Sequence, residues 1–320
     1  MNTQNFPVVV RDRKMETADV LCLELASLNG DVLPAFAPGA YVDVRLPEGL
    51  VRSYSLIQHA AGGRSYRIAV KREAQGRGGS AALHDNIKVG AQLLVSAPKG
   101  DFTLVEQPGV SCFIAGGIGI TPLLAMIERQ DELGYPWQLH FAAASPQSMA
   151  FREQLLELAQ RGGQVFLHFS DGSTPRMDIQ GIVRALDVHP GAHVYCCGPT
   201  RMVDDFLVAT KPLEPSFVHF ERFGADQPLA TEGGYTVELA STGQRYPVPA
   251  GKTILDVLLE AGLDLPYSCG QGVCGSCHTK VISGEVDHRD CYLTEDERAT
   301  NSAMLICCSG AKSSCLTLDL

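Results

Sequence analysis

The feature that most constrains this fold is a group of four cysteines near the end of the chain. Cys269, Cys274 and Cys277 stand in Ser-Cys-Gly-Gln-Gly-Val-Cys-Gly-Ser-Cys, and Cys307 follows after a long gap in Leu-Ile-Cys-Cys-Ser. Glycines separate the three close cysteines. Because glycine adopts positive φ readily, this stretch can wrap as a loop and turn backbone N–H groups toward the sulfurs. The C-terminal part is therefore expected to fold around a group held by thiolates.

The spacing of these cysteines distinguishes several classes of site. Cys-x4-Cys-x2-Cys with a distant fourth cysteine is the pattern of plant-type ferredoxins, which hold a 2Fe–2S cluster on four thiolates. Structural zinc sites usually pair Cys-x2-Cys with a second such pair or with closely spaced histidines. With 11 cysteines in 320 residues, the chain is also unlike a small disulfide scaffold. The spacing predicts an iron–sulfur cluster, and Cys307 and its neighbour Cys308 compete for the fourth position.

The charge balance limits the classes of partner. A net charge of −10 disfavours a nucleic-acid partner. From Gly234 onward, eleven acidic residues stand against six basic ones, which gives this segment a charge of −5. An acidic face can steer docking onto a basic redox partner. A surface that is merely solvated is the simpler alternative.

One stretch without charges, from Val110 to Ile127, is long enough for a membrane span. Its centre reads Ala-Gly-Gly-Ile-Gly-Ile-Thr-Pro, and glycine and proline are poor residues for the middle of a helix. A buried strand, a glycine turn and a helix explain the stretch better, so no membrane partner is expected. No signal peptide is visible, and the cysteines are expected to be free thiols, which favours a cytoplasmic location.

The pattern of strands and helices changes twice and divides the chain into domains. Short β-type runs separated by glycine and proline turns predict an antiparallel β-barrel over residues 1–107. Alternating strands and helices, including a helix over 149–160, predict an α/β Rossmann-like domain over residues 108–224. Residues 225–234 are expected to be a linker. Residues 235–320, which include the cysteine loop, are predicted to form an α+β ferredoxin domain of the β-grasp type.

Two turns in the second domain are candidates for nucleotide binding. The first follows the first strand of this domain and the second ends a later strand; they comprise Gly116, Gly117 and Gly119, and Cys197, Gly198 and Pro199. Glycines let a pyrophosphate approach the backbone, and the N-terminus of a following helix favours its negative charge. Because ligands bind beyond the carboxyl ends of parallel strands, we expect both turns to line one crevice. If the first turn is considered without the second, the alternative is a tight turn that binds no ligand.

The barrel carries a second group of candidate residues. They are the consecutive Arg52, Ser53, Tyr54 and Ser55, then Lys71 and Arg72, and then Gly78, Gly79 and Ser80 before a short helix. An aromatic ring can flank a flat ring system, and a helix start with glycines and nearby arginines suits a phosphate. The alternative for residues 52–55 is an ordinary strand without a cofactor. The alternative for the later basic and glycine residues is a solvated loop.

Together these motifs resemble the phthalate dioxygenase reductase-like flavoproteins, a branch of the ferredoxin–NADP reductase superfamily. This branch includes the reductase components of vanillate demethylase and related Rieske oxygenases. The resemblance covers essentially the whole chain and its domain order. It rests on Arg52-Ser-Tyr-Ser-Leu, Gly78-Gly-Ser, Gly116-Gly-Ile-Gly-Ile-Thr-Pro, Cys197-Gly-Pro, His219-Phe-Glu-Arg-Phe and the four cysteines.

The resemblance implies a cofactor for each domain. The residues implied to bind FMN are Arg52, Ser53, Tyr54, Ser55, Val70, Lys71, Arg72, Gly78, Gly79, Ser80, Thr121 and Phe223. Those implied to bind NADH are Gly116, Gly117, Gly119, Asp171, Cys197, Gly198 and Pro199. The implied cluster ligands are Cys269, Cys274, Cys277 and Cys307, rather than Cys308. Thr121, Cys197 and Phe223 are expected to shape the nicotinamide pocket, with Phe223 over the flavin ring.

The preference for NADH rests on Asp171, which follows the strand ending at Phe169. An acidic side chain there can accept hydrogen bonds from ribose hydroxyls and repels a 2′-phosphate. The alternative is that Asp171 is an ordinary turn residue in the sequence Asp-Gly.

The implied activity is that of an NADH-dependent flavin iron–sulfur oxidoreductase. A hydride passes from the nicotinamide to the flavin, and single electrons pass through the cluster to a separate Rieske oxygenase, such as an aromatic ring dioxygenase or an O-demethylase. Cofactors carry this chemistry, so no catalytic acid or base is expected. The alternatives are an FAD-containing NAD(P)H reductase serving a diiron monooxygenase, or a redox-sensing electron-carrier module.

The chain departs from the family pattern at two positions. Ala144 and Gly310 stand where many relatives carry arginine. The first departure puts one nucleotide contact in doubt. The second is expected to alter the docking surface near the cluster.

Overall fold

The computed structural model describes residues 5–46, 50–57, 63–73, 78–186, 189, 191–224 and 228–320. The chain divides into two compact units, Met1–Arg222 and Phe223–Leu320. Within the described residues, no helix has both the length and the apolar character to cross a bilayer.

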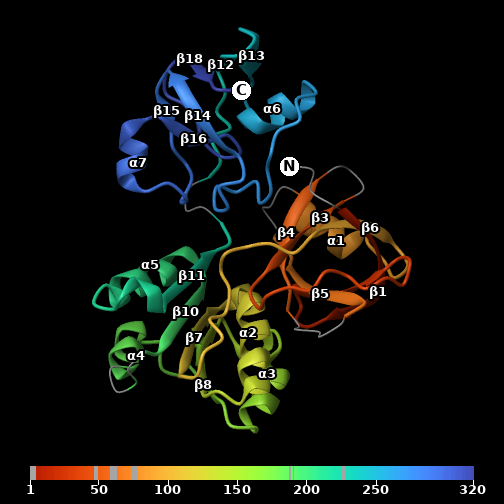
Figure 1. Ribbon diagram of the computed structural model, residues 1–320, viewed down its shortest axis with the longest axis vertical. Helices are drawn as coiled ribbons and strands as arrows, with labels where there is room; N and C mark the ends of the chain where they lie inside the picture. The colour runs from red at the N-terminus through yellow and green to blue at the C-terminus, as the bar shows by residue number, and fades with distance from the viewer. Residues whose placement is uncertain are drawn as a thin grey trace. The chain divides into compact units, whose positions relative to one another are not determined.

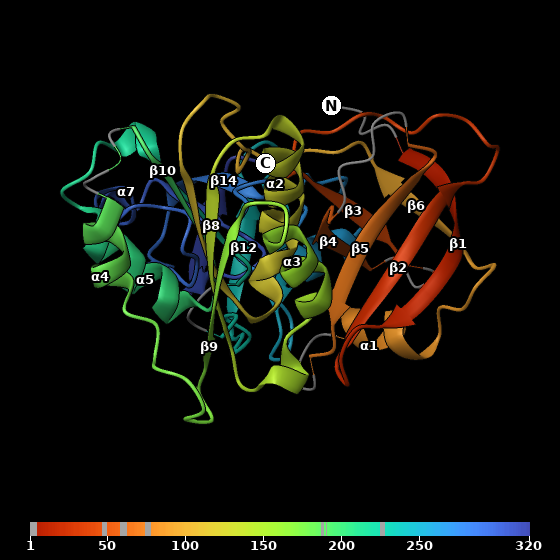
Figure 2. The same ribbon diagram turned by 90° about the horizontal axis from the view of Figure 1, so that it is seen from below.

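The first unit begins with a six-stranded antiparallel sheet that closes into a barrel (Figure 2). Its strands are β1 (Asn5–Met15), β2 (Val20–Ser27), β3 (Tyr41–Arg45), β4 (Val51–Ser55), β5 (Ser65–Lys71) and β6 (Gln92–Ser96), in the order β4-β3-β6-β1-β2-β5. A bridge between Leu56 and Ile68 joins the two ends of this order. Alternate residues point inward, so Leu21, Leu23 and Leu25 are fully buried. Helix α1 (Gly79–Asp85) packs on the barrel through Leu83.

The rest of the first unit is a parallel sheet with helices on both faces (Figure 1). The strands are β7 (Ser111–Gly116), β8 (Trp137–Ala143), β9 (Gln164–Phe169), β10 (His193–Gly198) and β11 (Val218–Arg222), in the order β11-β10-β7-β8-β9. Helices α2 (Ile120–Leu133) and α3 (Arg152–Ala159) cover one face, and α4 (Ile179–Ala185) and α5 (Thr200–Thr210) cover the other. Every residue of β7 is buried, as expected for a central parallel strand.

The structure differs from the sequence-based expectation at three elements of this sheet. Helix α3 begins at Arg152 rather than at residue 149, because the buried Phe151 has φ 59° and breaks helical geometry. Helix α5 and strand β11 were not expected. Strand β11 pairs along β10 in parallel and forms the edge of the sheet.

The barrel and the parallel sheet are fastened together by the segment between them. The backbone N–H of Leu104 donates to the Pro38 carbonyl of the barrel at 3.1 Å. The next residue, Val105, donates its N–H to the buried Tyr195 hydroxyl of β10 at 3.0 Å. One short segment therefore bonds to both halves of the first unit.

The second unit is a five-stranded mixed sheet crossed by a helix. Its strands are β12 (Tyr235–Leu239), β13 (Arg245–Val248), β14 (His278–Ser283), β16 (Ala303–Leu305) and β18 (Cys315–Leu318), in the order β13-β12-β18-β14-β16. The pair β15 (Val286–Asp287) and β17 (Gly310–Ala311) forms a second, small sheet. Helices α6 (Ile254–Glu260) and α7 (Glu295–Thr300) both begin with a capping box. The parallel pair β12–β18 and the packed α6 give the β-grasp arrangement.

Candidate functional site

The two predicted nucleotide turns meet at the carboxyl edge of the parallel sheet. Gly116 ends β7, Gly198 ends β10, and these two strands are neighbours in register. A Cβ built on Gly119 would overlap the Cys197 carbonyl oxygen, so the two turns lie in backbone contact. The close approach explains why glycine is required at position 119.

The space beside Gly116 and Gly198 is occupied by the side chains of Pro199 and Met202. A Cβ on Gly116 would lie 2.6 Å from Pro199 Cδ, and one on Gly198 would lie 2.7 Å from Met202 Sδ. Any residue larger than glycine at position 116 or 198 would therefore collide with Pro199 or Met202, and we call this close-packed junction of the two turns the cradle. Helix α5 begins at Thr200, directly after this cradle, and its N-terminal N–H groups favour an anion. Glycine backbone next to a helix start fits the pyrophosphate of a dinucleotide.

Two predicted residues of the nicotinamide pocket are buried beside the cradle. Thr121 is 2% exposed, and its hydroxyl donates to the Ile118 carbonyl at 2.9 Å. Cys197 is fully buried, and burial raises the pKa of its thiol far above the usual value. The thiol therefore stays neutral and acts as a packing group rather than as a nucleophile.

Sequence analysis did not single out Glu221, which pairs with Cys197 across β10 and β11. Its Oε2 atom is buried and has no hydrogen-bond partner among the described residues. Burial raises the pKa of this carboxyl to about 8. The only sequence signal was its place in His219-Phe-Glu-Arg-Phe, and that signal says nothing about burial.

The raised pKa of Glu221 predicts a stability that depends on pH. A carboxyl that stays protonated in the fold but ionises when unfolded stabilises the protein below about pH 4.5. This stability is lost as the pH rises toward about 8, at up to roughly 1.4 kcal/mol per pH unit. We expect Glu221→Gln to unfold at a higher temperature than the wild type at pH 8 and at nearly the same temperature at pH 5.

Calorimetry across this pH range measures the difference. The exposed Glu157 of α3 offers a control, since Glu157→Gln should follow the wild-type curve. Parallel curves for the wild type and Glu221→Gln would contradict the assignment.

The predicted ribose contact lies farther along the same sheet edge. Asp171 follows β9 and is exposed, and its carboxylate accepts hydrogen bonds from the Ser173 hydroxyl at 2.6 Å and the Ser173 N–H at 2.9 Å. The Ser173 hydroxyl and N–H lower the pKa of Asp171, so the carboxylate is ionised and held in one orientation. Ala144 is exposed just after β8, between the glycine turn and Asp171 in the order of strands. Both therefore lie on the edge where a bound dinucleotide would extend.

Part of the predicted flavin set gathers around the start of α1. The Arg52 side chain fills the space beside Gly79, where a Cβ would lie 2.7 Å from Arg52 Nε. The hydroxyl of Ser80 accepts a hydrogen bond from the Glu73 N–H at 3.0 Å. Gly78 precedes the helix with φ 78°. Because position 79 has no side chain, the Arg52 side chain can lie there. Its guanidinium group is suited to bind a phosphate nearby.

The remaining predicted flavin residues occupy different environments. Ser55 and Val70 are buried, Tyr54 is half-buried with its pKa raised by burial, and Ser53 donates to Asp43 at 2.8 Å. Lys71 is exposed, and Arg72 forms an ion pair with Asp85 on the surface at 2.6 Å.

The barrel and the first nucleotide turn are in contact. Strand β5 touches the 3₁₀ turn Gly117–Gly119, so the barrel site borders the nucleotide edge. Phe223 is the first residue of the second unit, and its place over a flavin stays a prediction.

The predicted cluster ligands lie in a loop whose backbone turns toward the sulfurs. Gly270, Gly272 and Gly275 all have positive φ, between 63° and 75°. The Gln271 N–H donates to Cys269 Sγ at 3.3 Å, and the Cys269 N–H donates to Cys274 Sγ at 3.5 Å. The glycines therefore supply the turns, while their neighbours supply the N–H groups.

The thiols of this loop are close to one another. Cys269 contacts both Cys274 and Cys307, and Cys277 is buried in the same loop. The Cys308 thiol lies 3.6 Å from the Leu305 carbonyl, and it also borders Gly272 of the loop, where a Cβ would lie 2.6 Å from its sulfur. In the described part of the chain, no three His, Cys, Asp or Glu side chains are arranged around one metal ion. A two-iron cluster needs two thiolates at each iron, and this donor set fits it.

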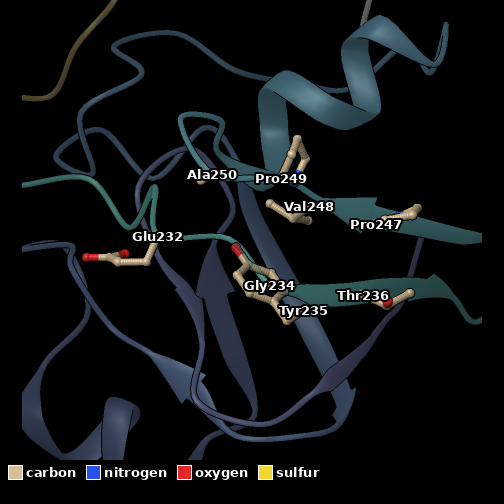
Figure 3. Close-up of a pocket in the computed structure, with 8 residues that line it drawn as sticks. All are labelled: Glu232, Gly234, Tyr235, Thr236, Pro247, Val248, Pro249 and Ala250. Atoms are coloured by element: carbon tan, nitrogen blue, oxygen red, sulfur yellow. The ribbon is translucent and has the colours of Figure 1, made fainter.

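A hollow of about 740 Å³ lies elsewhere on the second unit, between the start of β12 and the end of β13 (Figure 3). Tyr235 and Val248 are among the residues that line it. None of the predicted cofactor residues is among them, so this hollow is separate from the candidate site.

Comparison with known proteins gives matches over the parallel-sheet domain and over the second unit. The model of the oxidoreductase NAD-binding domain matches residues 113–207, and that of the 2Fe-2S iron-sulfur cluster binding domain matches residues 237–312. The phenoxybenzoate dioxygenase subunit beta of Ectopseudomonas oleovorans is 48% identical, over 94% of this chain and 93% of its own. The tetrachlorobenzoquinone reductase of Sphingobium chlorophenolicum is 42% identical, over 94% of both chains.

A solved structure shares the fold over nearly the whole chain. Phthalate dioxygenase reductase, described as a modular structure for electron transfer from pyridine nucleotides to [2Fe-2S], superimposes with a TM-score of 0.86 at 35% identity. The match covers 99% of this chain and 98% of that one.

Proposed function

This chain belongs to the phthalate dioxygenase reductase family, and we propose that it is the reductase component of a two-component Rieske oxygenase, with FMN, NADH and a 2Fe–2S cluster as its cofactors. The observation that carries the proposal is the backbone contact between Gly119 and Cys197 at the edge of the parallel sheet, in the same chain as the four predicted cluster cysteines. The cradle suits a pyrophosphate and the loop suits two irons.

Within this proposal, the side chains bind and orient rather than exchange protons with substrate. When bound, the flavin converts the two electrons of a hydride into single electrons that a cluster can accept. Thr121 and Cys197 are buried, and they would exclude water from a nicotinamide bound beside them. Arg52 and the N–H groups near Gly79 would hold the flavin phosphate. Cys269, Cys274, Cys277 and Cys307 hold the cluster.

The surface beside the cysteine loop suits a basic protein partner. Tyr292 is 51% exposed and lies directly against Gly275 of the loop. The first turn of α7, which follows closely, carries Glu295, Asp296 and Glu297. An aromatic side chain next to an acidic turn gives both contact area and electrostatic steering. We assign this face to the oxygenase, and the free thiols of the chain favour a reducing cytoplasm for the pair.

A reconstituted assay tests the proposal. Chromatography of the flavin released from one sample identifies the cofactor. A second sample of the intact protein is mixed with NADH and with either a Rieske oxygenase and its aromatic substrate or a chlorinated benzoquinone. We expect the released flavin to be FMN. We also expect NADH consumption to be coupled to product formation by the oxygenase. Rapid quinone reduction without transfer to any oxygenase would instead favour the activity named for the Sphingobium relative.

Replacing Asp171 by alanine is expected to lower the preference for NADH over NADPH by about tenfold. The expected loss corresponds to one charged hydrogen bond of roughly 1.5 kcal/mol, together with the lost repulsion of a 2′-phosphate. The ratio of kcat/KM for the two nucleotides measures it. Asp178→Ala is the matched control, because Asp178 caps α4 by accepting from the Gly181 N–H at 3.0 Å. An unchanged ratio in Asp171→Ala would remove the ribose role.

A further inference from the structure

A buried carboxylate lies against the cysteine loop within the second unit. The side chain of Asp290 has no exposed surface, and a Cβ built on Gly272 would lie 3.0 Å from the Asp290 Cα and 3.2 Å from its Cβ. The N–H of the next residue, Cys291, donates to the Gly272 carbonyl at 3.1 Å. Gly272 stands between Cys269 and Cys274 in the sequence. Asp290 therefore packs on the loop that carries two of the predicted cluster ligands.

The same carboxylate holds the backbone that leads into α7. Asp290 Oδ2 accepts the N–H of Leu293 at 2.8 Å and the N–H of Tyr292 at 3.2 Å. Tyr292 is the exposed aromatic residue that lies against Gly275 of the loop. One buried side chain therefore orients the segment that carries this aromatic residue, while its own backbone packs on the cysteine loop.

Three further side chains face the carboxylate. His288 Nδ1 lies 3.5 Å from Oδ1, the Ser309 hydroxyl donates to Oδ1 at 3.5 Å, and Arg298 Nη2 lies 3.7 Å from Oδ2. Burial lowers the pKa of His288, so its ring is neutral near pH 7. The guanidinium of Arg298 is always charged and is therefore the counter-charge of Asp290.

The chain after the fourth predicted ligand closes another side of this region. Gly310 is buried, and a Cβ there would lie 2.7 Å from Ala230 Cβ and 3.3 Å from the Tyr235 hydroxyl. The expectation that Gly310 alters an exposed docking surface is therefore wrong. Ala230 belongs to the predicted linker 225–234, of which residues 225–227 lie outside the described residues.

A fixed charge beside a cluster changes how readily the cluster accepts an electron. Reduction adds a negative charge, so a nearby carboxylate opposes it and lowers the reduction potential, whereas a nearby cation raises the potential. The Asp290 side chain is fully buried, but that of Arg298 is 32% exposed. Because water screens an exposed charge more than a buried one, the carboxylate is the stronger of the two.

We propose that Asp290 is a positioning residue of the cluster loop that also lowers the reduction potential of the cluster, with Arg298 as its partial counter-charge. The inference rests on the proposed function, in which the cluster passes electrons to an oxygenase. A lower potential makes the reduced cluster a stronger donor. Arg298 belongs to α7, so the counter-charge stands on the same helix as the acidic turn assigned to the partner.

Two substitutions with opposite expected effects test the electrostatic role. Asp290→Asn removes the charge but keeps an amide oxygen that can accept the N–H groups of Tyr292 and Leu293. We expect it to raise the equilibrium constant for cluster reduction about tenfold, which is about 59 mV for one electron. Arg298→Gln should lower this constant about threefold, and Arg298→Lys, which keeps the charge, should restore most of the wild-type value.

Redox titration of the holoenzyme, followed by the absorbance of the cluster, measures these constants. Asp287→Asn is the matched control, because Asp287 is partly exposed and pairs with Arg289 at 2.7 Å. We expect this control to change the constant by less than about twofold. A general loosening of the loop would shift both variants in the same direction. Shifts of the same sign in Asp290→Asn and Arg298→Gln, or no shift in Asp290→Asn, would overturn the electrostatic role.

Hydrogen exchange tests the positioning role without NADH or turnover. The amides of Tyr292 and Leu293 should exchange at nearly the wild-type rate in Asp290→Asn and at least about tenfold faster in Asp290→Ala, which has no acceptor. Equal exchange in Asp290→Ala and the wild type would remove the positioning role.

The two measurements separate this inference from the proposed function. A wild-type protein that holds a cluster but shows no shift in the variants leaves the proposed function standing and removes the electrostatic inference. A wild-type protein that holds no cluster removes the proposed function and the electrostatic role together, whereas the exchange rates still decide whether Asp290 orients this segment.

Discussion

Replacing Cys274 by serine is expected to abolish cluster-dependent reduction of an acceptor while NADH still bleaches the flavin at the wild-type rate. Cys274 Sγ contacts Cys269 and accepts the Cys269 N–H at 3.5 Å, which places it inside the set of facing thiols. A serine hydroxyl is a poor iron ligand, so the variant should lack bound iron and the absorbance of the cluster. The two reactions separate because the flavin and the cluster belong to different units of the chain.

Cys308→Ser is the matched control for this experiment. Its sulfur is fully buried and lies 3.6 Å from the Leu305 carbonyl, to which a serine hydroxyl can also donate. We expect this variant to keep its iron and both activities. Loss of iron in Cys308→Ser, with retention in Cys307→Ser, would reverse the assignment of the fourth ligand. Survival of acceptor reduction in Cys274→Ser would remove Cys274 from the ligand set.

Gly119→Ala is expected to lower kcat/KM for NADH by about 100-fold, the size of effect that a misplacement of about 1 Å produces in a substrate site. The new methyl group would overlap the Cys197 carbonyl oxygen, and both partners are backbone, so neither can turn aside. The two nucleotide turns must then separate, which opens the cradle. Dithionite, which needs no nucleotide site, should still reduce the flavin at the wild-type rate.

The neighbouring Gly117 provides the control for steric overlap. It has φ 53°, and a Cβ there would meet nothing within 4 Å. Asparagine tolerates this left-handed conformation, so Gly117→Asn should retain most of the reaction with NADH. A similar loss in both variants would show that the whole turn is sensitive to any side chain, and that the contact with Cys197 is not the cause.

The sequence predicted most strands because their signals are local. Turn residues bound each barrel strand, and β7 is an apolar run between a glycine turn and Gln107-Pro108-Gly109. Strand β11 was not predicted because its residues are mixed in polarity and mostly half-buried, as expected at the edge of a sheet. Helix α5 follows Gly198-Pro199, which reads as a turn, although Pro199 in fact sits at the N-cap, where proline is tolerated.

The parts of the candidate site that depend on local backbone chemistry could be predicted from the sequence. The parts that depend on tertiary packing could not. The cysteine loop is predicted from its spacing, and Gly116 and Gly119 are predicted from a glycine turn that becomes specific only together with the other motifs. Met202 and Glu221 enter the site only because β10 lies between β7 and β11, which is a property of the assembled sheet. Gly310 likewise packs against Ala230, which stands eighty positions earlier in the chain.

The hydrogen bond between the Val105 N–H and the Tyr195 hydroxyl has a consequence for how such chains evolve. A recombination event that separated the barrel from the parallel sheet would leave a buried phenol without its partner, at a cost of about 1–3 kcal/mol. A crossover at Arg222–Phe223 would separate the two compact units and leave the bond between Val105 and Tyr195 intact. We therefore expect gene fusions and rearrangements in this lineage to fall at that single peptide bond.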